Sequence, residues 1–242
     1  EKIEIYFLKK FLKKNLTFAS IVTTVNEPIT NYINELNIEN VCTVLNGFEK
    51  NVFEVLKEEK TKRFEFTIIG TIYPQQNLEI ILAGFKKFIS DKTSHQAHIN
   101  FIGVGAIPEV AEQIRNYLPN EYITITDKIE RTVALQIAKN SQVLFYMGWK
   151  GYSGIYSGKI FEYLGLKKNI LIAPGDNDVL DNLIKITKSG VIAETDEAVM
   201  KTLENWFREW KKNGSLKYHG LNISTYSREY QNGLIIDKLI KC

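Results

Sequence analysis

A glycine-rich stretch at residues 147–159 carries the strongest signal for chemistry in this sequence. Four of its thirteen residues are glycine and two are serine, and glycine lets backbone N–H groups approach an anion closely. The stretch runs into a predicted helix at Gly158, whose N-terminus offers free N–H donors and partial positive charge. Lys159 adds a positive charge in the first turn, which is unfavourable unless an anion such as a diphosphate binds beside it. The pattern indicates a phosphate-binding loop; a flexible crossover loop with an incidental lysine is the alternative.

Glu162 lies three residues after Lys159, on the same face of the predicted helix. One interpretation is an ion pair within the helix, which stabilises a helix by about 0.2–0.5 kcal/mol. The other is a carboxylate that accepts hydrogen bonds from a ribose diol. The spacing alone leaves both open.

Short apolar runs alternate with helical patterns along most of the chain. The runs are continuously apolar, as a parallel sheet covered on both faces requires. This order predicts a doubly wound, Rossmann-like α/β fold. We expect strands at 20–25, 41–45, 64–69, 99–103, 122–125, 143–146, 169–173 and 190–193. We expect helices at 28–36, 78–90, 108–117, 131–139, 158–166, 179–188, 196–212 and 227–241.

Two helix ends carry local signals. Asn26 comes just before Glu27-Pro28, as an N-cap followed by a proline in the first turn does. Gly190 follows Lys188-Ser189, and we expect it to cap the helix that ends there.

Ligands of open parallel sheets bind beyond the carboxyl ends of the strands. Gly70-Thr71 follows one predicted strand, Gly103-Val104-Gly105 ends another, and the glycine-rich stretch follows a third. The Gly103 pair lacks the third glycine and the acidic partner of a dinucleotide fingerprint, so we expect a tight turn there. No nucleophile elbow or Walker A pattern occurs, which leaves a triad hydrolase or an NTPase unsupported.

The pattern divides the chain into four parts. The pattern in residues 63–212 is typical of a complete nucleotide-binding domain. The pattern in residues 1–47 indicates the end of a preceding domain. The charged segment 48–62 predicts a linker, and residues 213–242 a C-terminal linker and final helix. The chain starts with Glu1 rather than Met, and we expect a fragment or a processed product.

Composition narrows the function classes. The 242 residues carry a net charge of +3, too weak and too dispersed to predict nucleic-acid binding. Cys42 and Cys242 form no disulfide framework or zinc spacing, which favours a reducing compartment. We expect the three histidines to lie at the surface and predict no metal site; they are His95, His98 and His219.

The N-terminal segment 1–16 mixes apolar residues such as Phe7 and Phe11 with lysines. A basic amphipathic helix can lie on an anionic membrane surface. The alternative, which we favour, is a helix separated from its packing partners by truncation, because charge runs are usually solvated faces.

The sequence from Gly154 to Leu164, with the apolar run at 169–172, resembles the donor-site signature of GT-B glycosyltransferases, and in particular the retaining enzymes of family 4. Residues 66–88 resemble the first strand, glycine loop and helix of their C-terminal domain. Residues 20–47 resemble the end of their N-terminal domain. Residues 176–194 and the helix start at Ser227 also match in order, so the resemblance covers most of residues 20–240.

The resemblance implies an enzyme that moves a sugar from a nucleoside-diphosphate sugar to a sugar or lipid-linked acceptor, in bacterial polysaccharide or glycoconjugate synthesis. It implies a retaining reaction with no metal and no cofactor, in which backbone amides and cations stabilise the leaving diphosphate. The chain would be mainly the donor-binding half of a cytoplasmic protein, with peripheral contact to the inner face of a membrane as an option. Its oligomeric state stays open.

The resemblance also assigns residues. Glu162 matches the glutamate that binds ribose, Gly70 and Thr71 match the loop facing the phosphates, and Ile129 and Arg131 lie where the base is contacted. We expect Lys159 and Glu162 to serve catalysis. The other expected donor-binding residues are Gln76, Gly103, Ser153, Gly154, Ile155, Tyr156, Ser157 and Gly158.

Three positions depart from the family pattern. Gly154 stands eight residues before Glu162, where the family has its first glutamate. Thr71 and Gln76 stand where the family has an arginine and a lysine for the phosphates. Lys159 is the cation left to take over some of that charge.

Two other functions stay open. A GT-B-shaped nucleotide-sugar epimerase would need acid and base side chains in the cleft, and few histidines or carboxylates lie near the loops. A non-catalytic α/β binding module fits the three neutral replacements and would bind no nucleotide.

Overall fold

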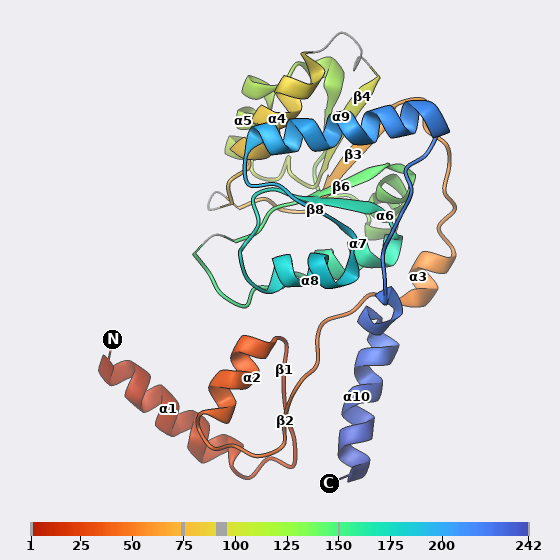
Figure 1. The fold of residues 1–242 in the computed structure, drawn as a ribbon. Coiled ribbons are helices and arrows are strands. Elements are labelled where there is room, and N and C mark those ends of the chain that lie inside the picture. The colour runs from red at the N-terminus through yellow and green to blue at the C-terminus, as the bar shows by residue number, and fades with distance from the viewer. Residues whose placement is uncertain (1, 74–75, 91–95, 150, 242) are drawn as a thin grey trace.

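The large domain of this computed structural model is built on a six-stranded, all-parallel sheet (Figure 1). The structure describes residues 2–73, 76–90, 96–149 and 151–241. The strand order is β5-β4-β3-β6-β7-β8. These strands are β3 (Phe64–Ile69), β4 (Ala97–Ile102), β5 (Ile123–Ile125), β6 (Val143–Tyr146), β7 (Asn169–Ile172) and β8 (Gly190–Ile192). The order runs outward from β3 and then restarts at β6 on its other side, which confirms the predicted doubly wound fold.

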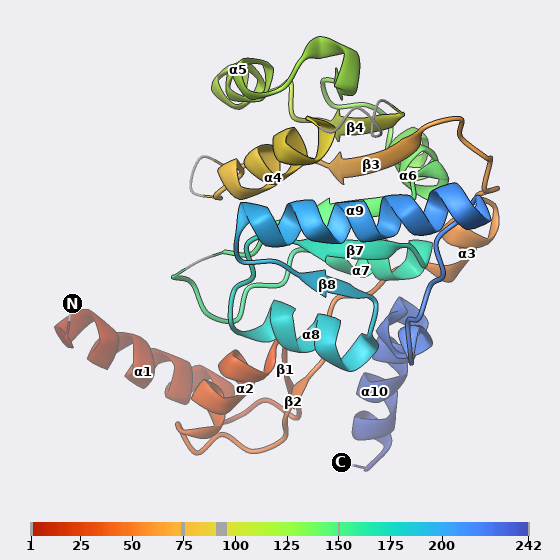
Figure 2. The ribbon, with the colours of Figure 1, turned by 45° about the horizontal axis from the view of Figure 1, so that its top comes forward.

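Helices cover both faces of this sheet, as Figures 1 and 2 show. One layer holds α4 (Glu79–Ile89), α5 (Pro108–Tyr117) and α9 (Asp196–Asn213). The other holds α6 (Arg131–Asn140), α7 (Gly158–Leu166) and α8 (Val179–Thr187). None of the helices formed by the described residues is long and apolar enough to cross a membrane.

Aromatic side chains of the central strands fix the sheet. Phe66 of β3 and Phe145 of β6 stack with ring centroids 5.3 Å apart, and both are fully buried. Phe66 also packs edge-on against Phe85 of α4. Burial of side chains of this size stabilises a fold by about 1.5–3 kcal/mol each, so the register of β3 and β6, and with it the position of the loops that follow them, is strongly specified.

A smaller parallel unit precedes this domain. It contains α1 (Lys2–Leu16), β1 (Val22–Thr24), α2 (Glu27–Asn34) and β2 (Val41–Thr43). Its own core consists of Ile33, Leu36 and Ile38, against which Leu12 and Leu16 of α1 pack. The predicted cap is confirmed, since the Asn26 side chain accepts a hydrogen bond from the Ile29 N–H at 2.8 Å.

Two segments pair where the chain passes between the parts. Phe48 and Ser227 form a parallel bridge: the Phe48 N–H donates to Tyr226, and the Arg228 N–H donates to Phe48. The helix α10 (Arg228–Lys241) then leaves the large domain on the side of β1 and β2 (Figure 1). Its Gln231 accepts a hydrogen bond from the Leu45 N–H at 2.8 Å.

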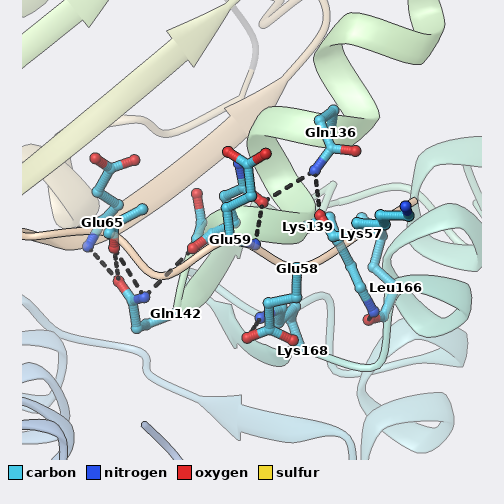
Figure 3. A network of polar contacts seen from close by, with 12 residues as sticks. Lys57, Glu58, Glu59, Glu65, Gln136, Lys139, Gln142, Leu166 and Lys168 are labelled. Carbon is cyan, nitrogen blue, oxygen red and sulfur yellow. Dashed lines mark hydrogen bonds and ion pairs between the residues drawn. The ribbon is translucent and has the colours of Figure 1, made fainter. Parts of the chain in front are cut away.

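The predicted linker carries more structure than the sequence indicated. It contains the short helix α3 (Lys50–Glu54), which the charged sequence did not predict. A tertiary contact stabilises it, since Phe53 packs edge-on against the buried Phe48. Beyond it, residues 57–61 lie along the amino ends of the strands, where Glu58 pairs with Lys168 and the Glu59 N–H donates to Asn140 (Figure 3).

Two smaller predictions are wrong. Gly190 does not cap α8: Lys188 holds the left-handed conformation there, with φ 49°. Gly190 is instead the first residue of β8, where an added Cβ would lie 2.0 Å from the Ile170 carbonyl oxygen.

His98 is buried rather than exposed, because it lies on β4, a strand whose two faces are both covered by helices. His219 is exposed as predicted, and His95 lies outside the described residues.

Candidate donor-binding site

The point where the strand order reverses lies between β3 and β6, and the loops after these two strands meet there. A cavity of about 200 Å³ opens between them. Four predicted residues line it, namely Thr71, Gln76, Ser157 and Lys159. Ligands of doubly wound sheets bind at this switch point, so the fold brings the predicted residues to the expected place.

Gly70 lets Lys159 approach the end of β3. Gly70 has φ 85°, and a Cβ at this position would lie 2.9 Å from Cε and 3.0 Å from Nζ of Lys159. The Lys159 Nζ donates a hydrogen bond to the Thr71 carbonyl at 2.9 Å. The Lys159 side chain therefore passes over Gly70, and its ammonium group lies at the start of the loop that follows β3.

The ammonium group of Lys159 is poorly compensated. Burial lowers its pKa below the ordinary value, and the nearby Glu162 raises it by less. Within the described part of the chain, no carboxylate lies within ion-pair distance of Lys159. A partly buried cation held by one carbonyl is suited to bind an anion, which would supply the missing charge.

Glu162 pairs with a residue of another helix. Its Oε1 accepts a hydrogen bond from Arg131 Nε at 2.7 Å and forms an ion pair with Arg131 Nη2, also at 2.7 Å. The ion pair within the helix between Lys159 and Glu162, one of the two sequence interpretations, is therefore not formed. Arg131 begins α6, so the structure unites two residues that the resemblance assigned separately to the ribose and to the base.

The glycine-rich loop is anchored at its middle. Gly154 is buried with φ 74°; its carbonyl accepts a hydrogen bond from Asn26 Nδ2, and its N–H donates to Asp178 Oδ2 at 2.6 Å. The sequence signalled Asn26 only as a helix cap, and it gave Asp178 no role. Both contact the loop because the fold brings three segments of the chain together.

The end of the loop is held by tyrosines. Tyr146 donates a hydrogen bond to Ser157 at 2.7 Å, and Tyr156 donates to the Val179 carbonyl at 3.1 Å. Tyr163 is fully buried and accepts a hydrogen bond from the Ile69 N–H at 2.8 Å. Burial raises the pKa of Tyr163, so its hydroxyl stays neutral as a structural partner of β3.

The remaining predicted residues are more scattered. Gln76 donates to the Met147 carbonyl at 3.3 Å and so bridges the two loops. Gly103 lies beside Gly70, where its added Cβ would stand 3.4 Å from the Gly70 Cα. Three others, Ser153, Ile155 and Gly158, belong to the loop without lining the cavity, and Ile129 lies just before α6 outside it.

Aromatic rings close one side of the cavity, which the sequence analysis did not predict. Tyr73 and Trp149 line it with ring centroids 5.5 Å apart, and Tyr152 packs edge-on against Trp149 at 5.9 Å. The aromatic residues Tyr73, Trp149 and Tyr152, which follow two neighbouring predicted strands, were the signal in the sequence that could have indicated this wall.

A larger cavity of about 620 Å³ lies at the opposite, amino ends of the strands. Lys168, Asn169 and Gln142 are among its lining residues. We assign the ligand site to the smaller cavity because loops at the carboxyl ends bind ligands in such sheets. The volume of this cavity, about 200 Å³, lies below the roughly 300–1,000 Å³ of sites for drug-sized ligands, so the cavity has room for only one part of a nucleotide sugar.

Among the described residues, no group of three or more His, Cys, Asp and Glu side chains is arranged to hold a metal ion. His98, the buried histidine, contacts Arg63 at 3.0 Å and Thr124 at 2.8 Å at the far edge of the sheet. Burial lowers the pKa of His98, which favours its neutral form.

The fold is similar to those of several solved enzymes. HepE from Anabaena, solved with UDP-glucose, is 11% identical with a TM-score of 0.68, over 99% of this chain and 70% of that one. A glycosyltransferase from Rickettsia africae is 12% identical with a TM-score of 0.63, over 95% and 62%. The UDP-GlcNAc 2-epimerase of Methanocaldococcus jannaschii is 14% identical with a TM-score of 0.59, over 93% and 62%.

No protein-family model and no curated protein sequence matches the chain. The chain spans 62% to 70% of the length of the three solved proteins. At 11–14% identity the likeness concerns the fold, and it confirms the GT-B fold that the resemblance implied. The chain has the GT-B fold, which it shares with these three solved proteins.

Proposed function

We propose that this chain is mainly the donor-binding half of a glycosyltransferase, which moves a sugar from a nucleoside-diphosphate sugar to an acceptor. The observation that carries the proposal is the pairing of Gly70 and Lys159 at the switch point of a GT-B fold. An uncompensated ammonium group above a positive-φ glycine fits the diphosphate of such a donor.

The chemistry follows from where charge develops. As the bond between sugar and diphosphate breaks, negative charge grows on the phosphate oxygens. Lys159 and the N-terminus of α7, which begins at Gly158, face the loop that would hold these oxygens. Fixed donors of this kind stabilise the transition state more than the ground state. We assign Lys159 to this role and Glu162 to the ribose.

Because the residues at positions 71, 76 and 154 are neutral, Lys159 is the one cation that we assign to stabilising the negative charge on the phosphates. Thr71 and Gln76 line the cavity but carry no charge. The resemblance to the family 4 enzymes supports a retaining reaction without a metal ion, as a further part of the proposal. Residues 1–47 would end an acceptor-side domain, and 48–62 and 213–242 would join it to the donor domain at 63–212.

Calorimetric titration of the chain with UDP, GDP, ADP and CMP, without added metal, tests the proposal. UDP comes first because HepE was solved with UDP-glucose. Saturable binding of one diphosphate, unaffected by a chelator, is the expected result. A chain that binds none of the four nucleotides contradicts the donor-site proposal.

A nucleotide-sugar epimerase is the second candidate, since an epimerase shares this fold at a TM-score of 0.59. Both functions predict nucleotide binding, and the products separate them. An epimerase converts UDP-GlcNAc to its 2-epimer without an acceptor, whereas a glycosyltransferase leaves the sugar configuration at that carbon unchanged.

A further inference from the structure

We propose that Asn26 is a positioning residue for the donor loop, and that through it the N-terminal unit controls nucleotide affinity. The proposal rests on the function proposed above. Asn26 comes from the small two-stranded unit, 128 residues before Gly154 in the chain, and it is buried. No other part of the predicted phosphate loop has a described hydrogen bond to that unit.

The cap of α2 fixes the orientation of the Asn26 amide. Its Oδ1 accepts a hydrogen bond from the Ile29 N–H at 2.8 Å. Because the oxygen is committed to the helix, the NH₂ group must point the other way. There it donates to the Gly154 carbonyl, so one side chain caps a helix and holds the donor loop at once.

Asp178 holds the opposite side of the same residue. It occupies the N-cap position of α8 but makes no cap hydrogen bond with its side chain. Its carboxylate instead accepts the Gly154 N–H at 2.6 Å. Asp176 caps α8 in its place, accepting hydrogen bonds from the N–H groups of Leu180 and Asp181, both at 3.1 Å. Asp178 is therefore available to the loop.

The glycine at 154 is required by this arrangement. Its φ of 74° lies in the left-handed region, and an added Cβ would meet the Asn26 amide at 3.1–3.4 Å. The amide thus fills the space beside a residue that has no side chain. This contact explains why this chain has glycine rather than glutamate at position 154, because the Asn26 amide occupies the space that a larger side chain would need.

The two hydrogen bonds to Gly154 order the glycine-rich loop before a ligand binds. Gly154 lies between the cavity-lining residues Trp149 and Ser157. A loop whose middle residue is fixed from both sides loses less conformational entropy when a diphosphate binds to it. Release of either hydrogen bond should therefore weaken binding without changing any group that faces the cavity.

Two variants separate the roles of Asn26. Asn26→Ser keeps an N-cap of similar strength but removes the NH₂ donor to Gly154. Asn26→Ala removes both. We expect hydrogen exchange in peptides covering 151–157 to become about fivefold faster in Asn26→Ser, since one hydrogen bond is worth about that factor. Exchange in α2 should stay unchanged in Asn26→Ser and rise in Asn26→Ala.

Nucleotide titration of the same variants gives the second measurement. The affinity for the diphosphate that binds the unaltered chain should fall about fivefold in Asn26→Ser and by a similar factor in Asp178→Ala. Loop exchange that changes only in Asn26→Ala, or an affinity that survives Asn26→Ser, would overturn the positioning role. Failure of the unaltered chain to bind any diphosphate contradicts the proposed function instead, while the exchange rates still decide whether Asn26 orders the loop.

Discussion

A partly buried lysine, Lys159, and a buried lysine, Lys168, lie at opposite ends of the strands of the large sheet, and their charges are compensated differently. Lys168, at the amino end of β7, forms an ion pair with Glu58 at 2.6 Å (Figure 3). Lys159, beyond the carboxyl ends of β3 and β6, donates to the Thr71 carbonyl instead. Burial lowers the pKa of both residues, and Glu58 partly restores that of Lys168.

The difference separates a structural lysine, Lys168, from the lysine that we propose binds the donor, Lys159. At the amino edge the linker supplies a carboxylate, and side chains such as Gln142 and Asn140 accept hydrogen bonds from backbone N–H groups of the linker and β3. At the carboxyl ends of the strands, Gly70 leaves space for the Lys159 side chain, and Lys159 has no carboxylate partner among the described residues. A buried charge costs free energy unless it is paired, and this cost supports our proposal that an external anion binds at the carboxyl ends of the strands.

Gly70→Ala should have the largest effect on this comparison. The left-handed conformation costs a non-glycine residue about 1–2 kcal/mol, and the new methyl group displaces Lys159. This strain lowers the free energy of unfolding, and the loss of the lysine contact should in addition weaken diphosphate binding by about 1–3 kcal/mol. Calorimetry measures this change, and Gly214→Ala, a positive-φ glycine with open space around it, is the matched control. Equal losses in both variants would show that strain alone is responsible.

Lys159→Met should weaken diphosphate binding by about 1–3 kcal/mol, the range for hydrogen bonds to charged groups. It should also raise the melting temperature, because it removes a partly buried charge that has no carboxylate partner among the described residues. Lys168→Met is the control: it should leave nucleotide affinity unchanged and should not raise the melting temperature. If the two variants behave alike, the distinction between the two edges is wrong.

Alkaline pH should reproduce part of the effect of Lys159→Met. In the proposed site it is the charged lysine that binds the diphosphate, and the pKa of Lys159 in the free protein lies below the ordinary 10.5. Affinity should therefore be constant below that lowered pKa and fall as the pH rises through it. Because the folded pKa is lowered, the charged form also destabilises the folded state below this pKa, and that cost disappears as the pH rises to the ordinary value. Titrations of Lys159→Met should show no such fall in affinity.

Glu162→Gln should give the smallest change, about 0.5–1.5 kcal/mol, and it should be selective. The unaltered chain should bind the ribonucleotide more tightly than its 2′-deoxy form, and the variant should lose most of this preference. Arg131→Ala removes the ion-pair partner but keeps the carboxylate, so the preference should survive there. A preference that is equal in the unaltered chain and in Glu162→Gln would contradict the ribose role.

Much of the fold could be predicted from periodicity alone. The bounds of β3, β6, α5 and α7 agree with the sequence prediction, because their continuous apolar runs and clear turn residues act locally. The helix α3 was missed because five residues carry no period, and the packing of Phe53 on Phe48 holds it. Gly190 was misassigned because a glycine near a helix end is ambiguous until the neighbouring strand is known.

The site divides in the same way. The sequence determined which groups could bind a phosphate, namely the glycine turns, the α7 N-terminus and Lys159, because these depend on residue type and short-range spacing. The tertiary structure decided how they are used. It separated Lys159 from Glu162, paired Glu162 with Arg131, and brought Asn26 to the loop from 128 residues away. Such partnerships depend on strand order and helix packing, so no local pattern in the chain records them.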